Sequence, residues 1–172
     1  VLQVSDGIAS VQQSFTIVVS NVNDAPFFTS TAVTIATEDA AYSYSITASD
    51  PDLGAVLTLT APTLPTWLTL TNTGNGIATL SGIPTNANVG IHNVTLNVSD
   101  GIANVDQTFT ITVTNVNDAP MFTSSAVTAS TEGAAYAYAI TANDPDLGDM
   151  LNITAPTLPA WLSLVDNGNG TA

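Results

Sequence analysis

The chain of 172 residues carries 14 acidic side chains and neither Lys nor Arg, so its formal net charge at pH 7 is −14. A charge of this sign argues against nucleic acids and anionic membranes as partners, and it makes small cations the natural counter-charge. The chain has no Cys, which excludes disulfides, and no apolar run reaches the roughly 20 residues of a membrane-spanning helix. We therefore expect no nucleic-acid partner and no direct insertion into a membrane.

The sequence repeats itself with an offset of 94 residues. NVNDAPFF at 21–28 returns as NVNDAPMF at 115–122, and aligning 1–78 with 95–172 gives 53 identities in 78 positions without a gap. A period of this length is typical of one small β domain and too long for a solenoid unit.

Three parts of a tandem array follow from this alignment. We expect 1–24 to be the C-terminal strands of a preceding repeat plus a linker, 25–118 to be a complete repeat, and 119–172 to be the N-terminal part of the following repeat. The last part has no counterparts of residues 79–94, so we expect its core to be incomplete unless a longer chain continues past it.

The predicted elements of the complete repeat are all strands. In chain order, they are expected within 27–37 and at 41–48, 56–60, 67–71, 77–80, 93–100 and 105–113. Alternating apolar residues place Tyr42, Tyr44 and Ile46 on one face of the second strand, and no segment has a helical period. About seven strands in 94 residues, separated by Gly, Pro and Asn, predict an all-β protein made of tandem immunoglobulin-like Greek-key sandwiches.

The aromatic and His residues offer little chemistry. Trp67 and Trp161 are each followed by strand-like alternation, which favours a place between the sheets, although an exposed indole would also suit a carbohydrate ligand. His92 has no second His or Cys near it in the sequence, and we expect it to have no chemical role. Neither an activated nucleophile nor a phosphate-binding loop is recognisable, so we predict a non-enzymatic protein.

Acidic residues occupy the ends of the predicted strands. Five positions are acidic in both copies of the repeat: Asp6/Asp100, Asp24/Asp118, Glu38/Glu132, Asp50/Asp144 and Asp52/Asp146. In a seven-strand sandwich the loops at 50–52 and 98–101 lie at the same end as the N-terminal junction, so Asp50, Asp52 and Asp100 should meet the linker residues Asn23 and Asp24.

Such a convergence of carboxylates predicts a cation site. Two carboxylates repel by roughly 1 kcal/mol at about 4 Å in water, and by more where water is excluded. A bound Ca²⁺ turns this repulsion into a net attraction, since it binds six to eight oxygens of carboxylates, amides, the backbone and water. Asp-Gly and Asp-Pro also favour turns without any ion, and that interpretation remains open for each motif taken alone.

These motifs resemble those of cadherin repeats. NVNDAPFF is similar to the cadherin linker Asp-x-Asn-Asp-Asn-x-Pro-x-Phe, SYSITASDPD to a second strand with its Asp-x-Asp, and VSDG to a late Asp-Gly. The pattern of PTWL, GNG and LSGIP is more similar to the dystroglycan-type cadherin-like, or "putative Ig", repeats of long bacterial surface proteins.

The resemblance implies ligands for the junction at 115–118. Asn117 and Asp118 of the linker would be joined by Glu38 from the repeat above and by Asp144 and Asp146 from the repeat below. By the same correspondence, Asp6 and Glu132 would serve neighbouring junctions. The cadherin Leu-Asp-Arg-Glu motif and the second Asn of the linker are absent, which implies one or two calcium ions per junction instead of three.

The expected function is mechanical. We expect a Ca²⁺-stiffened tandem repeat of a large extracellular or cell-surface protein, acting as a stalk, an adhesin or a filament segment. Its partners would be neighbouring repeats of the same or an identical chain, with a glycan or a cell-surface protein as the adhesion target. The alternative is a carbohydrate-binding accessory module of a secreted polysaccharide-degrading enzyme, with Trp67 and Trp161 as binding residues.

Overall fold

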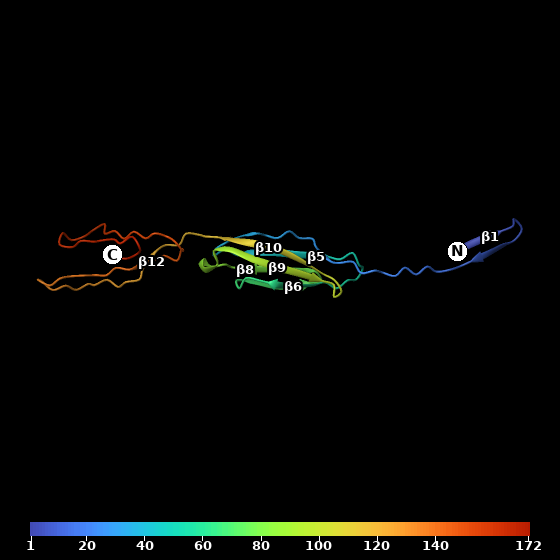
Figure 1. The fold of residues 1–172 in the computed structure, drawn as a ribbon, viewed down its shortest axis with the longest axis horizontal. Helices are drawn as coiled ribbons and strands as arrows, with labels where there is room; N and C mark the ends of the chain where they lie inside the picture. The colour runs from blue at the N-terminus through green and yellow to red at the C-terminus, as the bar shows by residue number, and fades with distance from the viewer.

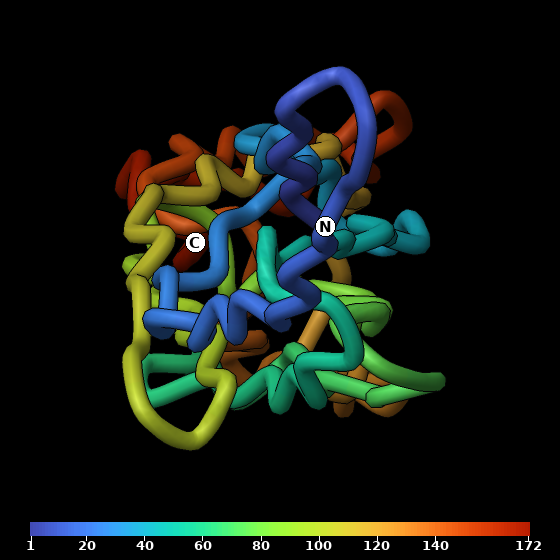
Figure 2. The backbone as a smooth tube through the Cα atoms, turned by 90° about the vertical axis from the view of Figure 1, so that its right-hand side faces the viewer, coloured from blue at the N-terminus to red at the C-terminus, as the bar shows by residue number.

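The structure is a computed structural model that describes residues 1–172. The chain is elongated, with a closed sandwich in the middle, a short hairpin toward the N-terminus and an open segment toward the C-terminus (Figure 1). Figure 2 looks along the long axis and shows these parts superposed in projection, so they follow one another along that axis. No helix in the structure is long and apolar enough to cross a bilayer.

The central sandwich consists of two four-stranded sheets. One has the order β4 (Ile35–Thr37), β10 (Asn104–Thr114), β9 (Gly90–Ser99) and β6 (Thr58–Thr63). The other has the order β3 (Phe27–Phe28), β5 (Tyr42–Ser49), β8 (Ile77–Gly82) and β7 (Leu68–Gly74). The prediction of an all-β, immunoglobulin-like sandwich is thus confirmed. A single 3₁₀ turn, η1 (Asn86–Asn88), leads from β8 into β9.

The predicted first strand at 27–37 is divided between the two sheets, so the expectation of one continuous strand was wrong. β3 pairs antiparallel with β5, whereas β4 pairs parallel with β10. A polar network fixes the crossing point: Tyr44 Oη lies 2.8 Å from Ser30 Oγ and donates to Gln107 Oε1 at 2.9 Å. Gln107 Nε2 in turn donates to the carbonyl oxygen of Ser30 at 3.1 Å. Each sheet therefore contributes a side chain to the network, which holds the segment where it changes sheets.

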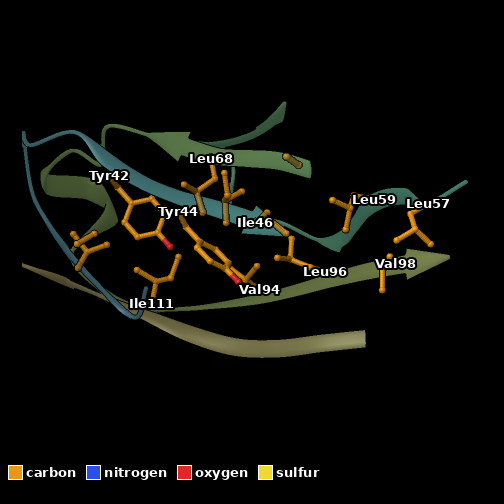
Figure 3. Packing of buried hydrophobic residues seen from close by; sticks show 14 residues of the cluster. Tyr42, Tyr44, Ile46, Leu57, Leu59, Leu68, Val94, Leu96, Val98 and Ile111 are labelled. Carbon is orange, nitrogen blue, oxygen red and sulfur yellow. The ribbon is translucent and has the colours of Figure 1, made fainter. Parts of the chain in front are cut away.

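Fourteen buried apolar residues form the core between the sheets (Figure 3). They come from alternate positions of the strands, so the period of two expected from the sequence is confirmed by Ile46, Leu80 and Leu96, which have no exposed surface. Burying one such side chain stabilises the fold by roughly 1.5–3 kcal/mol.

Trp67 packs against the edge of this core. Its ring makes edge-to-face contacts with Tyr42 at 5.7 Å and with His92 at 5.8 Å between centroids. His92 Nε2 also hydrogen-bonds to Asn88 O at 2.6 Å, so this His connects β9 to η1. The favoured interpretation of Trp67 as a packing residue therefore agrees with its position.

The two ends of the chain contain little regular structure. β1 (Leu2–Ser5) and β2 (Ser10–Gln13) form a hairpin whose residues are all exposed. In the C-terminal part, β11 (Met121–Phe122) pairs only with β12 (Ala142–Asn143). Trp161 is 66% exposed although it keeps a contact with Tyr136 at 5.9 Å. The favoured buried position therefore does not apply to Trp161.

Candidate metal centre at the repeat junctions

At the first junction, the linker is bonded to two end loops of the central sandwich. Asn21 Nδ2 donates to Asp52 Oδ1 at 3.0 Å, and the backbone N–H of Asp24 donates to Asp52 Oδ2 at 2.9 Å. Asn23 Nδ2 donates to Asp100 Oδ2 at 3.0 Å. The loop after β5 and the loop before β10 therefore lie at the same end of the sandwich, together with the linker.

Each of these loops uses one oxygen of its Asp to close its own turn. Asp100 Oδ1 accepts from the N–H groups of Ile102 and Ala103 at 2.7 and 2.6 Å. These two bonds favour the charged carboxylate and lower the pKa of Asp100, and the bond from Asn23 lowers it further. Asp50 Oδ1 accepts from the N–H of Asp52 at 2.7 Å, while Asp50 Oδ2 is buried without any partner.

At the second junction, Glu38 comes from the repeat above. Its N–H donates to Thr114 O at 3.0 Å, which fixes the end of β4 beside the end of β10. The side chain is only 2% exposed, and Oε2 accepts from the N–H of Val116 in the linker at 3.3 Å. Glu38 Oε1 is buried with no hydrogen-bond partner. A buried carboxylate oxygen without a donor is costly, and here it lies beside the linker.

The same junction has a direct bond between the two repeats. Asn86 Nδ2, in η1, donates to Asp146 Oδ1 at 2.9 Å and to Asp118 Oδ2 at 3.4 Å. Asp146 is 5% exposed, and its Oδ2 accepts from the N–H of Asp118 at 2.7 Å. One amide therefore bridges a carboxylate of the linker and a carboxylate of the repeat below.

Asp144 and Asp146 lie close to a third acidic residue, Asp149. Each of the three offers one carboxylate oxygen within 4.8 Å of those of the other two. The chain has no Lys or Arg that could neutralise them, so the carboxylates repel one another unless a cation from solution is bound. Hard oxygen ligands of this kind fit a cation such as Ca²⁺.

Three of the candidate residues are less closely involved. Asn117 Nδ2 donates to Asp118 O at 2.6 Å and makes no bond to a carboxylate. Asp6 is exposed in the β1–β2 turn, where bonds from the N–H groups of Ala9 and Ile8 lower its pKa. Glu132 is exposed in the C-terminal part. The structure therefore does not bring Asp6 or Glu132 to either cluster of carboxylates.

Sequence reasoning missed Asn21, Asp149 and Asn86. Asn21 is repeated as Asn115, so the repeat could have drawn attention to it, and Asp149 extends the DPDLG motif by one residue. Asn86 lies within 79–94, the stretch that occurs only once, so comparison of the copies gave no signal there.

The geometry defines a class of protein: tandem immunoglobulin-like sandwiches joined by a short linker. A family profile described as "Putative Ig domain" matches residues 25–114 and 119–171, and the chain belongs to this family. A comparison with curated proteins gives no match.

Solved structures with similar folds come from several kinds of protein. The endo-fucoidan hydrolase MfFcnA4 of glycoside hydrolase family 107 is 27% identical, with a TM-score of 0.50. The alignment covers 98% of this chain and 28% of the hydrolase, so the chain spans just over a quarter of that enzyme's length. The SrpA adhesin from Streptococcus sanguinis is 12% identical, with 59% of this chain and 65% of that chain covered and a TM-score of 0.47.

Proposed function

We propose that this chain is a non-enzymatic, Ca²⁺-stiffened tandem repeat of a large extracellular or cell-surface protein. It would act as a stalk, an adhesin or a filament segment in which each junction holds its own cation. The single observation that carries the proposal is the buried, unpartnered Oε1 of Glu38 beside the linker. An oxygen that is removed from water and has no donor suits a metal ligand better than a structural carboxylate.

The ligands would come from both sides of the junction. Glu38 belongs to the repeat above, Asp118 to the linker, and Asp144 and Asp146 to the repeat below. A cation shared by these groups would replace their mutual repulsion by attraction to a common centre. Bending the junction would then require ligands to leave the ion, which is how binding would stiffen an otherwise flexible linker.

Calcium titration and small-angle X-ray scattering test this proposal on the 172-residue chain. Isothermal titration calorimetry should show binding in the range of roughly 0.1–1 mM that is usual for extracellular modules. Added Ca²⁺ should lengthen the particle and narrow its distance distribution, and EDTA should reverse both changes. Identical scattering profiles in Ca²⁺ and in EDTA would show that the acidic loops are only turns.

A pair of variants separates the junction from general charge effects. Asp144→Asn combined with Asp146→Asn removes two charged candidate ligands of the second junction and should abolish millimolar binding there, which the titration would show as a lower stoichiometry. Asp106→Asn is the matched control, because Asp106 lies on β10 and its carboxylate bonds only to Asn97 Nδ2, at 2.6 Å. It should leave the titration unchanged.

The similarity to MfFcnA4 favours one alternative, a carbohydrate-binding accessory module of a polysaccharide-degrading enzyme. Trp161 is 66% exposed, whereas Trp67, at the same position of the complete repeat, is packed between Tyr42 and His92. Affinity electrophoresis in fucoidan tests the alternative. If fucoidan slows the migration of the parent chain but not that of Trp161→Ala, the carbohydrate-binding alternative is favoured over the mechanical role. If fucoidan does not change the migration of the parent chain, the mechanical role is the function.

A further inference from the structure

The two junctions satisfy the same carboxylate oxygen with different amides. At the first junction Asp52 Oδ1 accepts from Asn21 Nδ2 at 3.0 Å, and Asn21 belongs to the linker. The positions 94 residues later are Asp146 and Asn115. Asp146 Oδ1 nevertheless accepts from Asn86 Nδ2 at 2.9 Å, which belongs to the repeat above. The same acceptor position thus takes an amide of the linker at one junction and an amide of the repeat above at the other.

We propose that Asn86 is the residue through which one repeat engages the cation site of the next, as a bridging donor without the ion and as an oxygen ligand with it. The inference rests on the proposed function and adds a ligand to it. In the ion-free junction the amide N–H groups bridge Asp146 and Asp118, which reduces the repulsion between these two carboxylates. With Ca²⁺ bound, the amide turns over and presents its Oδ1.

The chemistry of the Asn side chain permits this exchange. An amide carries two N–H donors and one carbonyl oxygen on a planar group, so half a turn about its last bond exchanges them at nearly the same place. An N–H group repels a cation, whereas an Asn carbonyl oxygen is a common ligand of Ca²⁺. The exchange requires only a side-chain rotation, so the backbone of η1 can stay where it is.

The backbone around Asn86 is well fixed for such a role. Thr85 N–H donates to Asn88 Oδ1 at 2.9 Å, and Asn88 N–H donates to Thr85 O at 2.7 Å, which closes η1 at both ends. Asp39 N–H donates to Pro84 O at 2.9 Å, so the turn is tied to the residue that follows Glu38. A backbone hydrogen bond therefore joins the segment that carries Asn86 to the segment that carries Glu38.

The test compares Asn86→Asp with Asn88→Asp in the full 172-residue chain. Both substitutions add one negative charge to η1, but an Asp at position 88 keeps the oxygen that accepts from Thr85. If Asn86 faces the ion, Asn86→Asp should tighten Ca²⁺ binding by about tenfold in calorimetric titration, because affinity rises with the number of charged ligands. In EDTA it should lower the unfolding temperature, since its carboxylate would face Asp118 and Asp146 without a donor. Asn88→Asp should change the affinity less than twofold.

The outcomes separate this inference from the proposed function. If the unsubstituted chain binds no Ca²⁺, the proposed function fails and the inference fails with it. If the unsubstituted chain binds Ca²⁺ but Asn86→Asp binds it no more tightly than Asn88→Asp does, only the role of Asn86 is overturned. Should Asn86→Asp fail to fold, Asn86→Ala decides: a loss of affinity of about threefold or more supports the ligand role, and an unchanged affinity overturns it.

Discussion

Replacing Glu38 with Gln should change the stability of the chain in opposite directions with and without calcium. In EDTA the substitution removes the charge from a side chain that is only 2% exposed and has one oxygen without a donor. The Gln carbonyl oxygen can still accept the bond from Val116 N–H. The Gln NH2 group then takes the place of the unpartnered oxygen, but a buried neutral group costs less than a buried charge, so the variant should be more stable than the parent by at most about 1–3 kcal/mol.

Calcium should reverse the order of the two proteins. For a site with a Kd of roughly 0.1–1 mM, about 10 mM Ca²⁺ raises the free energy of unfolding of the parent by about 1.4–2.7 kcal/mol. For a domain of about 60–100 residues, a change of about 1 kcal/mol in the free energy of unfolding moves the unfolding temperature by about 4–8 °C. The Gln variant should lose most of the calcium-dependent shift, because Gln offers a neutral oxygen in place of a charged one.

Differential scanning calorimetry in EDTA and in Ca²⁺ measures both effects in one experiment. Glu132→Gln is the control, since Glu132 is the counterpart of Glu38 at the same repeat position but is exposed. It should behave like the parent in both solutions. A Glu38→Gln variant that is less stable than the parent in EDTA, or that keeps the full calcium shift, would refute the assignment of Glu38 as a ligand.

Three further expectations concern the sandwich and its acidic loops. Leu80→Ala should lower the free energy of unfolding by about 2–5 kcal/mol in urea titrations, because Leu80 has no exposed surface. Gly82→Ala should cost about 1–3 kcal/mol or more by the same measurement, since a Cβ there would overlap Trp67 O, whereas Gly74→Ala meets nothing within 4 Å and should not show this clash. Asp100→Asn should destabilise the chain at neutral pH, because the pKa of Asp100 is lowered in the folded state and its charged form therefore favours folding. The difference in the free energy of unfolding between the parent and Asp100→Asn should shrink as the pH falls below the ordinary pKa of 3.8 and through the lowered pKa of the folded state. Urea titrations at several pH values would measure this loss.

The strands were predictable wherever one face is buried. The segments that became β5, β9 and β10 alternate apolar and polar residues over eight or more positions, and such a pattern is compatible with only one register. The division of the first strand was not predictable, because residues 27–37 have no single period and the crossing depends on contacts with Tyr44 and Gln107. Those contacts join residues that are distant in sequence, so they cannot be recognised from a local sequence pattern.

Part of the candidate site was also predictable from the sequence. The acidic loops could be placed at one end of the sandwich because topology fixes which loops are neighbours, and the bonds from Asn23 to Asp100 and from Asp24 to Asp52 join those loops to the linker. The contribution of Asn86 could not be foreseen, because it depends on how one repeat sits on the next. The exposure of Trp161 likewise reflects what covers a residue, which its own flanking sequence does not specify.

The division of the first strand has a consequence for how the chain carries tension. β4 runs parallel to β10, and the two are bonded by Thr112 N–H to Thr34 O at 2.9 Å and by Glu38 N–H to Thr114 O at 3.0 Å. A pull on the two ends of the sandwich draws these neighbouring strands past each other along their own length. All the bonds between them are then loaded at once and must break together, instead of opening one after another as in a hairpin pulled from its open end. The parallel pair of β4 and β10 therefore resists such a pull in shear.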